Sequence, residues 1–332
     1  MGRFSNILFV VNRSSWLRAA YERAMTLAAR ESARLTALEV FEEVPHQLTP
    51  VNGSSKVPKT IGVLERRARL AKITNSRNRK VQVKLRVVRG KQFTEILGQV
   101  QRARHDLVIL PPDANEGFDR RTLTQLVRKC PCSFLLIKPN SQKRYSRIMA
   151  AVDPDSFDAV RNALNTRIMD IATAMARKEG SELHITNAWS APAEGLLRSR
   201  SGLVAEDVGR YVSSVLKNQT KEVELLLRNA NATRLKHRVH LVKGAAINVI
   251  PELARRTHID LLIMGTMSRS GIVGWFIGNT AEKILKHVDC SVLVVKPKGP
   301  ILPSRLKRKT VKSTQRKAVP ASRHSKKRVR AN

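Results

Sequence analysis

The chain carries one motif twice: CSFLLIKP at residues 132–139 returns as CSVLVVKP at residues 290–297. Each copy places a short apolar run between a Cys-Ser pair and a Lys-Pro pair, which predicts a buried strand with defined ends. Other stretches match in the same order, namely 7–12 with 148–153, 89–90 with 243–244, and 105–110 with 259–264. The repeated order predicts an internal duplication, in which one folding unit is present twice.

The first copy alternates apolar runs with amphipathic segments. A continuous apolar run such as 7–12 is typical of a strand covered on both faces, whereas residues 81–87 alternate in polarity and fit a strand near a sheet edge. Strands are expected at 7–12, 35–41, 81–87, 106–110 and 133–137, with helices after Ser14 or Ser15 and at 61–74, 93–103 and 122–129. Strands that alternate with helices predict a parallel sheet. We therefore predict an α/β fold of two tandem, doubly wound, parallel five-stranded sheets in a Rossmann-like three-layer sandwich.

These patterns divide the chain into three parts. We expect an N-terminal domain at residues 4–140 and a C-terminal domain at 145–298, joined by a short linker. Residues 299–332 lack apolar periodicity and are rich in Lys and Arg, so we expect a disordered basic tail.

The charge balance points to anionic partners. The 332 residues contain 62 Lys and Arg against 26 Asp and Glu, a net charge of +36, and residues 301–332 hold twelve of the basic residues and no acidic one. Such a charge attracts nucleic acid or an anionic membrane surface. A generally basic proteome, or a tail that only solubilises the chain, would give the same composition, so these alternatives stay open.

The three cysteines are Cys130, Cys132 and Cys290. Their number is odd and the first two are too close for an ordinary bridge, so no disulfide framework is implied, as suits a reducing cytoplasm. No signal peptide and no apolar stretch of about 18 residues is present. We expect a cytoplasmic protein without a transmembrane segment.

A glycine-rich stretch, MGTMSRSGIVGWFIGNTAE at residues 264–282, lies between a predicted strand and a predicted helix. Glycines let a backbone approach a phosphate closely, and the first N–H groups of a helix point at an anion. The spacing fits neither the Rossmann fingerprint nor the P-loop. A tight turn uses the same residues, so the loop alone leaves ligand binding and a structural turn both open.

With the duplication and this loop together, residues 4–298 resemble the universal stress protein family in its tandem two-domain form. The resemblance implies that a nucleotide-binding domain has an acidic residue after strand one and a loop of pattern G-x-x-G-x(9)-G-[ST] after strand four. In a doubly wound sheet both lie at the switch point, where ligands bind. In the first copy Asn12 replaces the acid and the glycines of the loop are largely gone. No nucleotide is expected there.

Carried onto the second copy, the resemblance implies a site for ATP or another small ligand. The implied residues are Asp153, Met264, Gly265, Ser268, Gly278, Asn279 and Thr280. Two of them depart from the pattern, since Ser268 replaces a glycine and Asn279 replaces the Ser or Thr, although Thr280 follows directly. Asp153, just before Pro154, would alternatively cap the next helix.

Other candidate residues favour structural roles. Arg269 could neutralise a phosphate, but a solvated arginine is the simpler interpretation in so basic a chain. Trp275 and Phe276 fit packing or a dimer contact better than base stacking, which leaves self-association open. The histidines and cysteines show no metal-binding spacing. No Ser-His-Asp or Cys-His constellation is recognisable, so no enzyme is predicted, and slow ATP hydrolysis would need a base that the sequence does not identify.

The resemblance implies a role in stress survival, including resistance to DNA damage, as a regulator or binding protein with an adenine nucleotide as partner. The alternative hypothesis is a polyanion-binding protein that engages DNA or RNA through its basic surface and residues 303–332. Such binding would release counterions and depend steeply on salt.

Overall fold

The structure is a computed structural model that describes residues 3–12, 16–42, 59–74, 81–111, 120–138, 144–155, 157–199, 205–266 and 278–297. The expected tail at 299–332 and the loop residues Ser268, Arg269, Trp275 and Phe276 lie outside these ranges.

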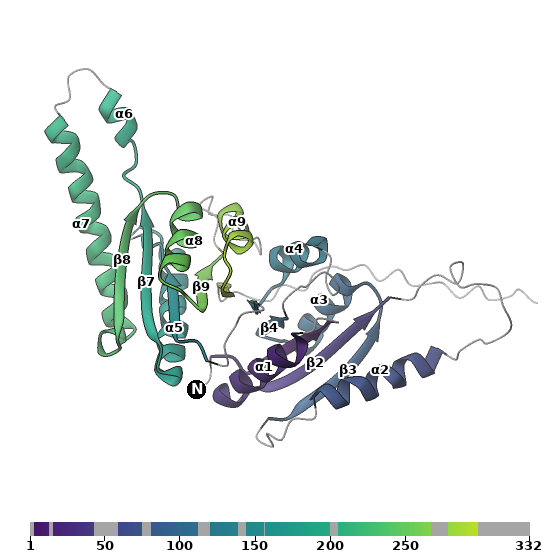
Figure 1. The fold of residues 1–332 in the computed structure, drawn as a ribbon. Coiled ribbons are helices and arrows are strands. Elements are labelled where there is room, and N and C mark those ends of the chain that lie inside the picture. Colours follow the sequence, from purple (N-terminus) through teal and green to yellow (C-terminus); the bar gives the residue numbers. More distant parts are fainter. Residues whose placement is uncertain are drawn as a thin grey trace, which may run out of the picture. The chain divides into compact units, whose positions relative to one another are not determined.

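The first half alternates strands and helices as the sequence predicts. Its elements are β1 (Asn6–Val11), α1 (Leu17–Glu31), β2 (Arg34–Phe41), α2 (Lys59–Thr74), β3 (Val83–Arg89), α3 (Gln92–Ala103), β4 (Leu107–Leu110), α4 (Arg120–Lys129) and β5 (Ser133–Leu136). Helices α1 and α2 lie along β2 and β3 (Figure 1).

The second half repeats this order with one additional short helix, α6, and with longer helices at the positions of α1 and α2. Its elements are β6 (Arg147–Ala151), α5 (Ala159–Glu179), β7 (Glu182–Trp189), α6 (Glu194–Ser199), α7 (Ala205–Asn229), β8 (His237–Lys243), α8 (Ala246–Arg256), β9 (Leu261–Gly265), α9 (Asn279–His287) and β10 (Ser291–Val295). None of the helices that the structure describes is long and apolar enough to cross a membrane.

The ten strands that the structure describes belong to one sheet, in the order β3-β2-β1-β4-β5-β10-β9-β6-β7-β8. Strands within each half are parallel, which confirms the predicted α/β fold with a doubly wound order in each half. The structure adds one feature: β5 and β10 pair antiparallel, with Leu293 opposite Leu135. Both strands are fully buried and apolar, and pairing them removes two exposed sheet edges.

Two apolar layers sandwich this sheet. One layer joins alternate strand residues to α1, α2, α5 and α7, and the other joins the intervening residues to α3, α4, α8 and α9. Each layer runs through both halves without a break, so the halves share their core. Successive side chains of a strand point to opposite faces, which is why both layers are apolar.

The repeated Cys-Ser…Lys-Pro motif joins the halves. The backbone N–H of Lys296 donates to Ser133 Oγ at 3.3 Å, and the N–H of Lys138 donates to Ser291 Oγ at 3.2 Å. Ser133 starts β5 and Ser291 starts β10, whereas Lys138 follows β5 and Lys296 follows β10. Each hydrogen bond therefore joins the start of one strand to the residues after the other strand. The duplication is therefore expressed as a reciprocal pair of contacts at the β5–β10 seam.

Candidate functional site

The predicted site lies at the carboxyl ends of β6 and β9, which are neighbours in the sheet. From β6 the chain continues through α5 to β7 on one side, whereas β9 lies on the other side, so the two strands flank the switch point. Ala151 pairs with Met264 near these ends, which brings Asp153 and Gly265 to the same edge. The Gly278 N–H donates to the Thr266 carbonyl at 3.2 Å and so holds the start of α9 at this edge.

Asp153 has a fixed backbone and an open carboxylate. Its N–H donates to Asn165 Oδ1 at 3.1 Å, and Asn165 Nδ2 donates to its carbonyl at 2.9 Å. The side chain is 53% exposed. The cap of α5 is Asp158, which accepts from the Arg161 N–H at 2.9 Å, so Asp153 does not cap this helix.

Arg161 contacts the predicted site, and the sequence analysis did not single it out. Its guanidinium lies 3.5 Å from Asp153 Oδ2, and 3.3 Å from both Asp155 Oδ2 and Asp158 Oδ2. One cation thus contacts three carboxylates at the edge of the predicted site, and the four side chains together carry a net negative charge. The only sequence signal was the spacing Asp-x-Asp-x-x-Asp-x-x-Arg after the strand.

Met264 and Gly265 are fixed mainly by packing. The Met264 side chain is buried in the second apolar layer, so only its backbone faces the strand end. A Cβ on Gly265 would lie 2.7 Å from Leu164 Cδ2 and 3.2 Å from Ile168 Cδ1. The close approach of α5 therefore accounts for this glycine independently of any ligand.

Gly278, Asn279 and Thr280 form the start of α9. Gly278 is the N-cap residue and makes no side-chain capping bond, while Asn279 and Thr280 are exposed. The first N–H groups of a helix have no partner within the helix and carry the positive end of its dipole. This end of α9 is chemically suited to an anion.

A buried acceptor borders the site on β7. Asn187 Nδ2 donates to the Val152 carbonyl at 3.1 Å, but the buried Asn187 Oδ1 has no hydrogen-bond partner among the described residues. A buried unpaired amide oxygen is costly, so such an atom is notable beside a candidate site. The sequence pattern gave no hint of it.

The corresponding edge of the first half has Asn12 where the second half has Asp153. Asn12 follows β1 and is buried. Beside it on β2 the buried Glu39 carboxylate is held by Arg66 at 2.9 Å and Arg69 at 2.5 Å. Both arginines come from α2 and contact Glu39 Oε1, while the buried Oε2 has no hydrogen-bond partner among the described residues.

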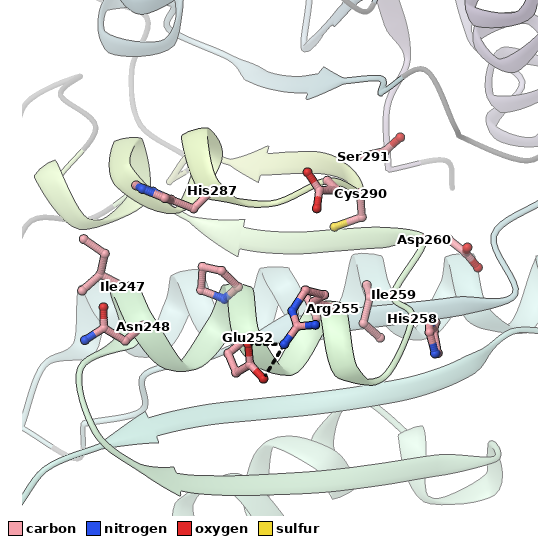
Figure 2. A pocket seen from close by; sticks show the side chains of 13 residues that line it. Ile247, Asn248, Glu252, Arg255, His258, Ile259, Asp260, His287, Cys290 and Ser291 are labelled. Atoms are coloured by element: carbon pink, nitrogen blue, oxygen red, sulfur yellow. Dashed lines mark hydrogen bonds and ion pairs between the residues drawn. The ribbon is translucent and has the colours of Figure 1, made fainter.

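A separate cavity of about 690 Å³ lies between α8 and α9 (Figure 2). It lies near the amino ends of β9 and β10, where Asp260 and Ser291 line it, so it is at the opposite edge from the predicted site. Figure 2 shows Glu252 and Arg255 paired on one wall, 2.9 Å apart. None of the predicted site residues lines this cavity.

The buried His184 on β7 pairs with the half-buried His240 on β8. The His184 and His240 rings are stacked with centroids 5.2 Å apart, and His184 Nδ1 lies 3.1 Å from His240 Nε2. Burial first, then the neighbouring His240, lowers the pKa of His184 to about 4. Among the described residues, no group of three or more His, Cys, Asp or Glu side chains is placed to hold a metal ion.

The architecture defines a protein with two doubly wound α/β units in tandem, each bearing the switch-point edge at which such folds bind ligands. The chain belongs to the universal stress protein family, whose model matches residues 3–138 and 144–296.

Relatives and solved structures agree with this assignment. The chain is 24% identical over 309 residues to Universal stress protein E of Escherichia coli (strain K12), covering 90% of this chain and 95% of that protein. It is 24% identical over 314 residues to the Universal stress protein E homolog of Haemophilus influenzae, covering 89% and 98%. A crystal structure of a putative universal stress protein from Pseudomonas aeruginosa matches the fold with a TM-score of 0.61, at 21% identity over 89% of this chain and 94% of that one.

Proposed function

We propose that this tandem universal stress protein binds an adenine nucleotide such as ATP in its C-terminal half, at the edge formed by Asp153 and the start of α9. The observation that carries the proposal is the pairing of Gly278 N–H with the Thr266 carbonyl, which holds a helix N-terminus beside the strand whose end carries an exposed carboxylate. The two groups complement opposite ends of a nucleotide. A carboxylate accepts from hydroxyl or amino groups, and helix N–H groups bind phosphate.

The surrounding residues support this assignment of roles. Asn165 fixes the Asp153 backbone, so the carboxylate is preorganised. Arg161 contacts the Asp153 carboxylate at 3.5 Å and so helps to fix its position. Asn187 Oδ1 supplies a further buried acceptor. Met264 and Gly265 would contribute backbone only, while Ser268 is proposed from the sequence alone.

We infer that the N-terminal half, residues 4–140, supports the second half and holds no nucleotide. Asn12 offers no negative charge, and Glu39 is neutralised by Arg66 and Arg69. The protein would then act in the cytoplasm as a binding or regulatory protein in stress survival, including survival of DNA damage, and not as an enzyme.

A second candidate function is polyanion binding, and the observation favouring it is the charge of the tail. Residues 301–332 hold twelve basic and no acidic residues. Deleting residues 303–332 should then abolish most retention on heparin or duplex DNA and flatten its salt dependence. Retention that is equal with and without these residues would refute this function.

The nucleotide site is tested by titrating Mg-ATP into the protein by calorimetry. Asp153→Ala should weaken binding about tenfold to a hundredfold, the effect of losing a hydrogen bond to a charged group. Gly278→Trp should weaken binding because its indole would occupy the space beside the first N–H groups of α9. Gly278 has an ordinary φ of −66°, so its backbone accepts a side chain. Asp207→Ala, which removes an exposed carboxylate on α7, is the matched control and should bind as the unchanged protein does. Equal affinity in all four proteins would disprove the proposed site.

A further inference from the structure

Two buried thiols lie side by side at the joint between the halves. Cys130 follows α4 and donates its N–H to the Leu126 carbonyl at 2.8 Å, while Cys132 directly precedes β5. Their sulfur atoms are 3.5 Å apart, and the residues are 2% and 8% exposed. No part of the proposed nucleotide site involves them.

A buried lysine from the other half accompanies this pair. Lys296 follows β10, and its Nζ donates to the Val127 carbonyl at 3.2 Å, in the last turn of α4. A cation is favourable at the carbonyl end of a helix. Burial lowers the pKa of Lys296 to about 8, although both cysteines oppose this shift.

The two thiols differ in acidity. The hydrogen bond from Cys132 lowers the pKa of Cys130 against the effect of burial, and the charge of Lys296 lowers it further. The same hydrogen bond, together with burial, raises the pKa of Cys132. When Cys132 is the donor of this hydrogen bond, Cys130 is the thiol that ionises first. A thiolate beside a second thiol is the arrangement of an attacking and a resolving cysteine.

The duplication provides an internal comparison. At the other end of the seam Cys290 and Lys138 occupy the equivalent motif positions, but Val288 stands where the first copy has Cys130. Lys138 is partly exposed, and burial raises the pKa of Cys290 to about 11. Only the first copy therefore has two thiols, although both copies have the shared cysteine and lysine.

We propose that Cys130 and Cys132 form a reversible dithiol–disulfide site that reacts with hydrogen peroxide, and that Lys296 is its positioning residue. The Cys130 thiolate attacks one peroxide oxygen and breaks the O–O bond. The sulfur becomes a sulfenic acid, and the departing hydroxide takes up a proton to form water. The Cys132 sulfur then attacks the Cys130 sulfur, and the S–S bond forms as a second water leaves with the Cys132 proton. Two thiols are oxidised to one disulfide, and one peroxide is reduced to two waters.

The spacing makes this bridge reversible. One residue, Pro131, separates the cysteines, so the ring is small and strained, and strained disulfides are reduced readily by thiols. The bridge also removes the Cys130 thiolate, which the charge of Lys296 favours. The backbone N–H of Lys296 donates a hydrogen bond to Ser133 Oγ across the β5–β10 seam. The redox state of the Cys130–Cys132 pair is therefore coupled to the contact between the halves.

The test uses the full chain, fully reduced, treated with hydrogen peroxide and quenched with an alkylating agent before mass spectrometry. We expect loss of two hydrogen atoms, a bridge mapped to Cys130 and Cys132, one alkylated cysteine at 290, and full recovery of three thiols with dithiothreitol. Cys290→Ser should oxidise at the same rate. Cys132→Ser should stop at a Cys130 sulfenic acid, trapped by dimedone.

Lysine variants test the positioning role. Each unit of increase in a thiol pKa lowers the thiolate fraction tenfold and raises its nucleophilicity about threefold, for a net loss of about threefold. Lys296→Gln should therefore slow bridge formation about threefold or more, whereas Lys138→Gln should leave it unchanged. Three alkylated cysteines after peroxide treatment, or a bridge that includes Cys290, would overturn the site. Equal rates in both lysine variants would overturn the role of Lys296.

Discussion

Glu179, at the end of α5, is a buried acid that links α5 to α1, as Glu31 of α1 does through its 2.8 Å pair with Lys178. Arg23 donates to both of its carboxylate oxygens at 3.1 Å, Arg30 lies 2.7 Å away, and the N–H of Tyr145 donates to Oε2 at 2.7 Å. Arg23 and Glu179 are only 7% and 4% exposed. The Arg23 guanidinium also lies 3.4 Å from the centre of the Tyr145 ring.

Replacing Glu179 by Gln keeps the shape and one carbonyl acceptor but removes the negative charge. Breaking a buried ion pair by removing one partner costs about 3–5 kcal/mol, because the other charge stays buried without compensation. The Arg30 guanidinium is partly exposed and can be solvated in the variant. The charge that stays buried without compensation is therefore that of Arg23. We therefore expect Glu179→Gln to lower the free energy of unfolding by about 3 kcal/mol.

Urea denaturation followed by circular dichroism measures this loss. Glu224→Gln is the matched control, since Glu224 pairs with Arg228 on the exposed side of α7 at 3.3 Å. An exposed pair at this spacing contributes about 0.5 kcal/mol or less. A loss below about 1 kcal/mol for Glu179→Gln, or equal losses for both variants, would refute the view that this buried ion cluster holds the halves together.

Two further predictions concern packing and acid stability. Gly265→Ala places a methyl group 2.7 Å from Leu164 Cδ2 and should cost about 1–3 kcal/mol in urea denaturation, whereas unchanged stability would mean that packing does not require this glycine. His184 has a pKa of about 4, lowered by burial and by His240, against 6.5 when unfolded, so the unfolded chain binds its proton first and stability falls as the pH drops from 6.5 toward 4. Thermal melts between pH 6.5 and 4 should show that His184→Asn reduces the acid-induced loss of unfolding free energy by about 2 kcal/mol. The same pH dependence in the variant and the unchanged protein would contradict the role of His184.

The sequence predicted the strands well because strands buried on both faces are continuous apolar runs. β5 (Ser133–Leu136) and β9 (Leu261–Gly265) lie within a residue or two of the expected ranges. The alternation at residues 81–87 correctly predicted an edge strand, observed as β3 (Val83–Arg89). The duplication then gave the order of the second half.

The pairing of β5 with β10 could not be predicted from the sequence. Two apolar edge strands can each be covered in several ways, and their pattern does not say which edge meets which. The same limit hid the burial of Lys296, because a lysine next to a proline is normally a surface residue.

The candidate site was only partly predictable. The position of Asp153 after a strand placed it at the switch point, and the structure has it there. Its partner Arg161 and the unpaired oxygen of Asn187 depend on packing between elements that sequence patterns do not join. The packing of Leu164 on Gly265 is likewise a tertiary contact.

Identifying the small molecule carried by the protein tests the central proposal most directly. The protein is purified at low salt, incubated with Mg-ATP, washed and unfolded, and the released compounds are measured by mass spectrometry and absorbance. We expect one adenine nucleotide per chain, and loss of that nucleotide when Asp153→Ala and Gly278→Trp are combined. Release of no nucleotide, or of an equal amount from the double variant, would contradict the proposed site in the C-terminal half.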